Sequence, residues 1–145
     1  MIRPARRADL LDVFQLEKQC FPQPWPYAAF ERHIEAVAFL IAAGPNGIVG
    51  YVVGDLTDGF PGSVGHIKDL AVHPDYRRRG IARELLSRAL FLLGQEGAVR
   101  AELEVRKSND AARALYRDFG FEPYSERDGY YADGENAILM HRSFR

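Results

Sequence analysis

The sequence predicts an α/β fold built on one mixed sheet. The main evidence is a strand at 65–72, a helix at 80–94 and a strand at 101–105 in direct succession. Two strands joined by a crossover helix lie parallel, whereas the other strands have short connections and should be antiparallel. The chain has 145 residues, of which 47% are hydrophobic. We therefore expect a single domain over 1–145 with the order β-α-α-β-β-β-α-β-α-β-β.

The N-terminal half should place two helices between its first two strands. Its predicted elements are a strand at 2–5, helices at 8–19 and 27–36, and strands at 38–43 and 48–55. Apolar residues at helical spacing predict the first helix. Three prolines within 22–26 separate the two helices, because proline removes a helical hydrogen bond. The turn residues at 45–47 join the two strands as a hairpin.

The C-terminal half alternates strands and helices. Its predicted elements are strands at 65–72 and 101–105, helices at 80–94 and 109–120, and strands at 121–127 and 137–141. Helix 80–94 carries one apolar face, made by Ile81, Leu85, Leu86, Ala89, Leu92 and Leu93. Asn109 can cap the following helix, and Gly120 can end it.

The turn at 77–82 is a candidate anion site. It consists of Arg77, Arg78, Arg79, Gly80, Ile81 and Ala82, at the start of a helix. A helix start has free N–H groups and a favourable dipole, glycine permits close approach, and arginines add forked hydrogen bonds. These features suit a phosphate or pyrophosphate, although arginine-rich turns are equally common as solvated surface. Neither G-x-x-x-x-G-K-[ST] nor G-x-G-x-x-G occurs, which argues against a P-loop or a Rossmann site.

The bulk composition excludes several partners. The formal net charge of -1 provides no global basic field for nucleic acid. No apolar stretch approaches the roughly 18 residues of a spanning helix, so we expect no membrane association. The single cysteine, Cys20, excludes an internal disulfide and fits the reducing cytoplasm, where we expect a packed thiol. The four histidines are scattered without cysteine partners, so we expect no metal site.

Several polar side chains are candidates for chemistry, each with a plain structural alternative. Glu104 lies in a strand between two helices, where a carboxylate is a poor filler, unless that sheet face is exposed. Tyr116 could be an ordinary core tyrosine, and Asn109 could be only a helix cap. His66 begins its strand and could face the same space as Glu104. Tyr130 and Tyr131 could contact a substrate or cover one end of the sheet.

Four segments together resemble the GNAT superfamily of acetyl-CoA-dependent N-acetyltransferases. Residues 77–82 fit its [QR]-x-x-G-x-[GA] pattern. Residues 103–121 resemble the L-E-V-R-x-S-N-x-x-A-x-x-L-Y-x-x-x-G-F signature of RimI-type protein N-terminal acetyltransferases. Residues 129–137 resemble the Y-Y-A-D-G-E-D-A segment of archaeal enzymes and of the NatA catalytic subunit. Residues 20–25, Cys-Phe-Pro-Gln-Pro-Trp, resemble a loop of the bacterial RimI group.

The resemblance implies a sheet that splays between its fourth and fifth strands, flanked by about four helices, with acetyl-CoA in the gap. It implies that the backbone of Leu70, Ala71 and Val72 pairs with the pantetheine arm. It further implies that residues 77–82 cradle the pyrophosphate, that Asn109 contacts the cofactor, and that Tyr116 sits near its sulfur. Glu104 takes the position of the general base. The residues expected to hold the substrate are Phe21, Pro22, Trp25, Tyr130 and Tyr131.

The implied reaction acetylates a protein α-amine, on a ribosomal protein or on nascent chains. Two positions depart from some relatives. Gln23 stands where several NatA-type enzymes have an acidic residue. Some relatives have a histidine at the position of Glu104 and a tyrosine at that of His66, so His66 is a second candidate base. One alternative is a GNAT enzyme acting on a small amine or a lysine side chain. Another is a non-catalytic acyl-CoA sensor, which would need neither Glu104 nor Tyr116.

Overall fold

A computed structural model describes residues 1–144 and confirms the predicted order of elements. The helices are α1 (Leu10–Cys20), α2 (Tyr27–Arg32), α3 (Ile81–Gln95) and α4 (Asp110–Asp118), with 3-10 turns at Arg7–Asp9 and Pro74–Tyr76. The strands are β1 (Ile2–Pro4), β2 (Ala38–Gly44), β3 (Gly47–Thr57), β4 (Val64–Val72), β5 (Arg100–Arg106), β6 (Glu122–Arg127) and β7 (Ala137–Ser143). The predicted helix at 27–36 is too long: it ends at Arg32, and turn hydrogen bonds such as Ala36 N–H to His33 O (2.9 Å) follow.

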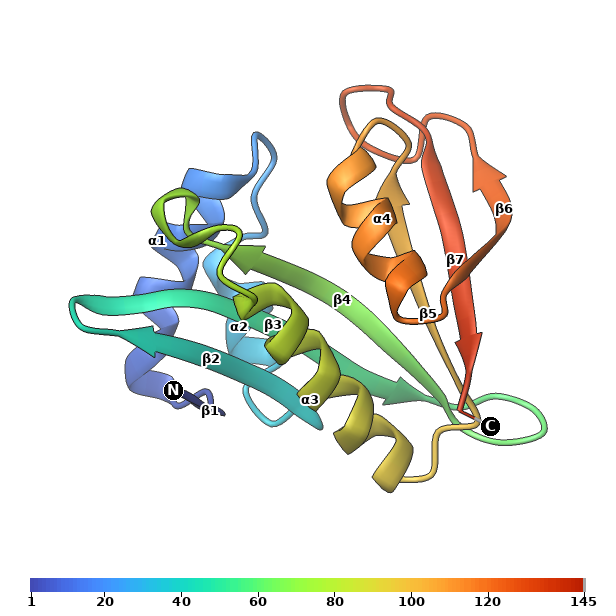
Figure 1. Cartoon of the computed structure of the whole chain (residues 1–145), viewed down its shortest axis with the longest axis horizontal. Helices are drawn as coiled ribbons and strands as arrows, with labels where there is room; N and C mark the ends of the chain where they lie inside the picture. Colours follow the sequence, from blue (N-terminus) through green and yellow to red (C-terminus); the bar gives the residue numbers. More distant parts are fainter. Residues whose placement is uncertain (145) are drawn as a thin grey trace.

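The strands form one sheet in the order β1-β2-β3-β4-β5-β7-β6 (Figure 1). Only β4 and β5 pair in parallel, and the other neighbours are antiparallel, as expected from the connections. Strand β7 lies between β5 and β6 and pairs antiparallel with both. The last two strands therefore form a hairpin whose second strand is the inner one.

Strands β4 and β5 separate soon after they begin. They pair at Val64–Arg100, Gly65–Ala101 and His66–Glu102, and then diverge toward their C-terminal ends. The divergence is plain in Figure 1, where β4 remains with β3 while β5 leans away with β7. Strand β4 also carries a bulge on its β3 side: Val53 pairs with Asp69 and Gly54 with Ile67, which leaves Lys68 as an extra residue. The predicted splay is therefore present between the fourth and fifth strands.

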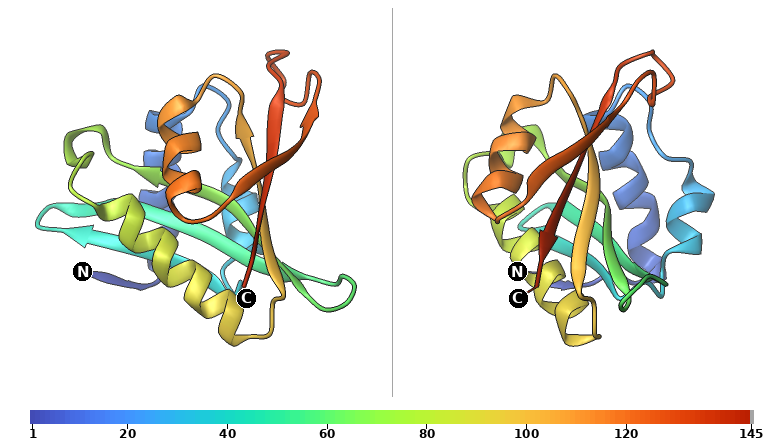
Figure 2. Two further views of the ribbon diagram at one scale, coloured as in Figure 1. Left: turned by 45° about the vertical axis from the view of Figure 1, so that its right-hand side comes forward. Right: turned by 90° about the vertical axis from the view of Figure 1, so that its right-hand side faces the viewer.

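Two hydrophobic cores cover the two faces of the sheet. Helices α3 and α4 lie on one face, and α1 and α2 lie on the other (Figure 2). Buried residues of α3, including Leu85, Leu86, Ala89 and Leu93, pack on the sheet, as their spacing predicts. The opposite core joins α1 and α2 to β2 and β3 around Phe30, Ile41 and Tyr51. No helix within residues 1–144 has the length and apolar character that crossing a bilayer requires.

We predict that the packing of α3 dominates the stability of the first core. Leu93 is 0% exposed, so Leu93→Ala should lower the free energy of unfolding by about 2–5 kcal/mol through lost burial and a residual cavity. Leu11 on α1 is 58% exposed, and Leu11→Ala should stay within about 0.5 kcal/mol of the wild type. Urea titration followed by circular dichroism measures both. Equal losses in the two variants would contradict this view of the core.

Candidate active site

The main cavity lies where β4 and β5 separate. Its wall is formed by Glu17, Phe21, Gln23, Trp25, Ile67, Lys68, Asp69, Leu70, Glu104, Val105, Arg106, Asn109, Ala112, Tyr116 and Tyr131. These residues come from α1 and its following loop, from both separating strands, from the start of α4, and from the β6–β7 loop. Sequence reasoning placed Glu104, Tyr116, Leu70, Asn109, Phe21, Trp25 and Tyr131 at the site, and the structure brings these seven to one cavity.

Glu104 and His66 meet across the root of the gap. Oε1 of Glu104 lies 2.9 Å from Nε2 of His66, and the two side chains are 25% and 29% exposed. His66 occupies the last paired position of β4, whereas Glu104 lies beyond the last parallel pair of β5. Glu104 lines the cavity. His66 is not part of the lining and contacts the Glu104 carboxylate. The expectation that the two residues face a common space is confirmed.

Tyr116 presents a protonated hydroxyl to the same cavity. Its side chain is buried in α4, and its ring packs edge-on against Phe121 at 5.9 Å. Burial raises the pKa of Tyr116. Tyr116 is part of the cavity lining.

The predicted arginine turn forms a second cavity along the same gap. It is lined by Val72, Tyr76, Arg77, Arg78, Gly80, Ile81, Ala82, Arg83, Ala111, Ala114 and Leu115. Gly80 caps α3 at φ +80°, and a Cβ placed on it would meet nothing within 4 Å. Arg78 also has a left-handed φ of +64°, a conformation that costs roughly 1–3 kcal/mol and is typical of ligand sites.

The arginines of this turn have different environments. Nε of Arg77 donates to the carbonyl of Val72 at 3.1 Å, which fixes the turn to the end of β4. Arg83, in the first turn of α3, also lines this cavity, where it forms an ion pair with Asp118 at 2.5 Å, and the sequence reasoning missed it. Arg79 lies outside this lining, and its guanidinium stacks 5.0 Å from the ring centre of Tyr76. That Arg79 shares the cradle therefore stays a prediction.

Four other predicted residues have positions that the sequence left open. Asn109 caps α4, accepting from Ala112 N–H at 3.1 Å, and it also lines the main cavity. Pro22 and Tyr130 do not line the cavity, and Tyr130 is 45% exposed. Ala71 points into the core beneath α1, so only its backbone can serve a ligand.

Sequence reasoning missed a buried acidic cluster of Glu17, Tyr51 and Asp69. The Tyr51 hydroxyl donates to Oε1 of Glu17 and lies 3.4 Å from Oδ2 of Asp69. Oε2 of Glu17 accepts from Trp25 N–H at 2.8 Å. The available signal was Glu17 itself: it stands one helical turn after Val13 on the apolar face of α1, where a carboxylate needs partners.

The cluster keeps a proton on Asp69. Burial raises the pKa of Asp69 well above its usual range, and the neighbouring Glu17 carboxyl raises it further through a hydrogen bond and like charge. Burial also raises the pKa of Tyr51, so the phenol stays neutral. The wall of the cavity therefore includes a carboxyl group, at Asp69, that holds its proton to a higher pH than a free aspartate does.

Cys20 is packed, as expected, yet it lies beside the arginine turn. Its Sγ is 3.6 Å from the Val72 carbonyl and 3.8 Å from Nη2 of Arg77. Burial raises the pKa of the Cys20 thiol and outweighs the contrary effect of Arg77, so the thiol is not activated as a nucleophile.

Residues 1–144 contain no group of three or more side chains suited to hold a metal ion.

Comparisons with known proteins find relatives along almost the whole chain. The sequence profile of the Acetyltransferase (GNAT) family matches residues 10–121. An N-alpha-acetyltransferase of Saccharolobus solfataricus is 36% identical over 152 aligned residues, covering 97% of this chain and 91% of the relative. N-alpha-acetyltransferase RimI of Mycobacterium tuberculosis is 38% identical over 141 residues, covering 94% and 87%. The crystal structure of the ribosomal-protein-S18-alanine N-acetyltransferase from Escherichia coli superposes with a TM-score of 0.85 at 28% identity, covering 99% and 92%.

We predict that Asp69→Asn stabilises the protein at high pH. In the unfolded chain an aspartate ionises near pH 3.9, about its ordinary pKa. Because the folded pKa is raised, the wild-type free energy of unfolding falls as pH increases from that value through the folded pKa, and stays lower above it. Asparagine does not ionise, so the Asp69→Asn variant does not lose this stability. Its melting temperature should exceed that of the wild type at pH 8 and nearly equal it at pH 4.

The control for this experiment is Asp58→Asn, which changes an exposed loop carboxylate. Calorimetry at both pH values should give the control the same small temperature difference at each. A melting-temperature difference for Asp69→Asn that does not grow with pH would show that the buried carboxyl is not protonated.

Proposed function

The chain belongs to the acetyltransferase (GNAT) family, and we propose that it transfers the acetyl group of acetyl-CoA to the N-terminal α-amine of proteins. The observation that carries this proposal is the separation of β4 from β5, which places the arginine turn and the Glu104–Tyr116 cavity along one gap. Relatives with N-terminal acetyltransferase names align over almost the whole chain, which supports the same substrate class.

The arginine turn suits the pyrophosphate of acetyl-CoA. Arg77, Arg78 and Arg83 line the second cavity, where Gly80 leaves space that a side chain would fill. The first-turn N–H groups of α3 have no carbonyl one turn earlier, so they can donate to phosphate oxygens. The backbone of Leu70 to Val72, on the open edge of β4, is in place to pair with the pantetheine arm. Acetyl-CoA supplies an acetyl thioester to this gap.

We assign Glu104 as the general base. A protein α-amine has a pKa of about 7.7–8.0 and is mostly protonated at neutral pH, but only its free lone pair can attack a thioester. Glu104, directly or through a water, can take that proton before the amine attacks, and the second proton that the nitrogen loses once the C–N bond has formed passes to solvent. His66 lies 2.9 Å away and can hold the carboxylate in place or share the proton. His66 thus remains the second candidate base.

Tyr116 is the proposed general acid. As the C–S bond breaks, the leaving thiolate needs one proton, and the raised pKa of the buried Tyr116 keeps a proton on its hydroxyl. Tyr116 recovers its proton from solvent, and Glu104 gives up the proton that it took, so the enzyme ends unchanged. No covalent attachment to the chain is required.

The substrate enters from the side of α1 and the β6–β7 loop. Phe21, Trp25 and Tyr131 line this mouth, and Pro22 and Tyr130 flank it. A ribosomal protein is a suitable target class, because the Escherichia coli structural relative is described as acting on ribosomal protein S18. We propose a cytoplasmic site of action, where ribosomes and acetyl-CoA meet.

We predict that a free N-terminus is required. Short peptides with free N-termini should be acetylated, while the same peptides with blocked N-termini and internal lysines should not. Release of free thiol from acetyl-CoA measures the rate, and mass spectrometry locates the acetyl group. Efficient modification of the blocked peptides would favour the lysine or small-amine alternative. Acetyl-CoA binding without thiol release on any peptide or small amine would favour the sensor alternative.

We predict that Glu104→Gln lowers kcat roughly 10²–10⁴-fold, the usual scale for a general base. The loss should be greatest below neutral pH, where the amine is mostly protonated. Glu102→Gln, two residues earlier on β5 and paired with Arg100 at 2.8 Å, is the matched control and should stay near wild-type activity. If Glu104→Gln remains within a few fold of the wild type from pH 6 to 9, His66 or bulk water is the base.

A further inference from the structure

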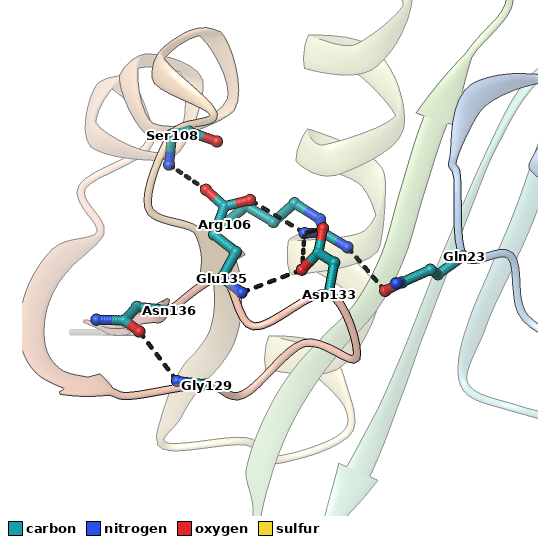
Figure 3. Close-up of polar contacts among 7 residues, drawn as sticks. All are labelled: Gln23, Arg106, Ser108, Gly129, Asp133, Glu135 and Asn136. Atoms are coloured by element: carbon teal, nitrogen blue, oxygen red, sulfur yellow. Dashed lines mark hydrogen bonds and ion pairs between the residues drawn. The ribbon is translucent and has the colours of Figure 1, made fainter.

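Arg106 is the centre of a polar network at the mouth of the main cavity (Figure 3). It ends β5, two residues after Glu104, and its side chain is 21% exposed. Its Nη1 donates to both carboxylate oxygens of Asp133, at 3.1 and 2.8 Å, and to Oε1 of Glu135 at 3.0 Å. Its Nη2 donates to Oε1 of Gln23 at 3.2 Å. The guanidinium also lies 4.1 Å from the ring centre of Tyr131.

These contacts join two loops that belong to different parts of the split sheet. Gln23 lies in the loop between α1 and α2, on the side of β4. Tyr131, Asp133 and Glu135 lie in the β6–β7 loop, which follows β5 in the other part. Strands β4 and β5 no longer pair at this depth, so the bond between Arg106 and Gln23 crosses the gap as a side-chain tie. Figure 3 shows Gln23 reaching toward Arg106 from the opposite side.

The β6–β7 side of the network is strongly held. Oε2 of Glu135 accepts from Ser108 N–H at 2.8 Å, and Oδ1 of Asp133 accepts from Glu135 N–H at 3.1 Å. The backbone hydrogen bond from Glu135, followed by the bond from Arg106, lowers the pKa of Asp133. Bonds from Ser108 and Arg106 likewise lower the pKa of Glu135. Both carboxylates are thus ionised at neutral pH and hold Nη1 of the guanidinium, while Nη2 donates to Gln23.

We propose that Arg106 is a positioning residue for peptide binding, and that its bond to Gln23 holds the two loops of the peptide mouth at the spacing the substrate needs. This inference rests on the proposed function. Arg106 does not reach the reacting atoms in this scheme. It orients the Tyr131 ring from one side and the Gln23 loop from the other, while Glu104 and Tyr116 act deeper in the gap.

The side-chain oxygen at position 23 is the acceptor that this tie requires. The Gln23 amide oxygen needs only one donor, and Arg106 already has two carboxylate partners. A planar guanidinium can serve all three acceptors at once, because its five N–H groups point in fixed directions. Lysine at position 106 keeps the charge but not this forked geometry.

The first test uses peptide kinetics in Gln23 variants. Gln23→Leu removes the acceptor at similar size and should raise the peptide KM about three- to tenfold, the scale of one ordinary intramolecular hydrogen bond. The KM for acetyl-CoA and the kcat should remain near wild type. Gln23→Glu keeps an oxygen at the same place and should preserve the peptide KM within about twofold. Gln95→Leu, at the far end of α3, is the control.

The second test combines the two positions. Arg106→Met keeps an unbranched stem but removes every donor, and it should raise the peptide KM more than Gln23→Leu does. In the Arg106→Met background, Gln23→Leu should have no further effect, because the bond is already gone. Arg100→Met, at the other end of β5, is the matched control. Equal effects of Gln23→Leu in both backgrounds would overturn the proposed tie.

The third test needs no substrate, so it separates this inference from the proposed function. Amides of Tyr131, Gly134 and Glu135 are hydrogen-bonded within the β6–β7 loop. Their hydrogen exchange should accelerate in Arg106→Met and Arg106→Lys, but not in Arg100→Met. Unchanged exchange in both Arg106 variants overturns the positioning role, whatever the activity. A wild type that never acetylates peptides overturns the proposed function, while faster exchange would still support Arg106 as the residue that orders the mouth.

Discussion

The early separation of two parallel strands is the constraint on which the rest of the structure depends. Beyond His66, β4 has lost its partner on one side, and β5 has lost its partner on the facing side. Backbone N–H and C=O groups inside a protein must find hydrogen-bond partners, so an opened sheet is costly unless a ligand or solvent satisfies the exposed edges. The bulge at Lys68 bends β4 at this same point. A gap with polar edges, rather than a filled core, is the result.

The charges along this gap are sorted by depth and side. The cavity by the arginine turn is lined by Arg77, Arg78 and Arg83 and by no carboxylate. The cavity at the peptide side is lined by the carboxyl groups of Glu17, Asp69 and Glu104 and by the cations Lys68 and Arg106. The polyanionic part of a ligand therefore meets a lining of one sign at the turn, whereas the amine side has both signs within reach. The overall charge of -1 hides this separation.

Two polar networks hold the loop between α1 and α2. Glu17 binds the loop backbone at Trp25 and connects it through Tyr51 to β3 and β4. Arg106 binds the same loop at Gln23 and connects it to the β6–β7 loop. The first network is buried and contains a carboxyl whose pKa is raised, whereas the second is near the surface and contains two carboxyls whose pKa values are lowered. The loop that meets the substrate is therefore anchored from inside the core and from across the gap.

The sequence by itself determined the element order, the one parallel pair, the cap at Asn109 and the arginine turn. These features depend on local periodicity, capping and turn chemistry, which act over a few residues. Tertiary structure alone decided the rest. The sequence contains Glu17 and Asp69, but only the packing of α1 on β3 and β4 brings them to Tyr51. Likewise, Gln23 and Arg106 are 83 residues apart. Periodicity indicates which face of an element is buried, but the partner of that face is set by how the elements pack.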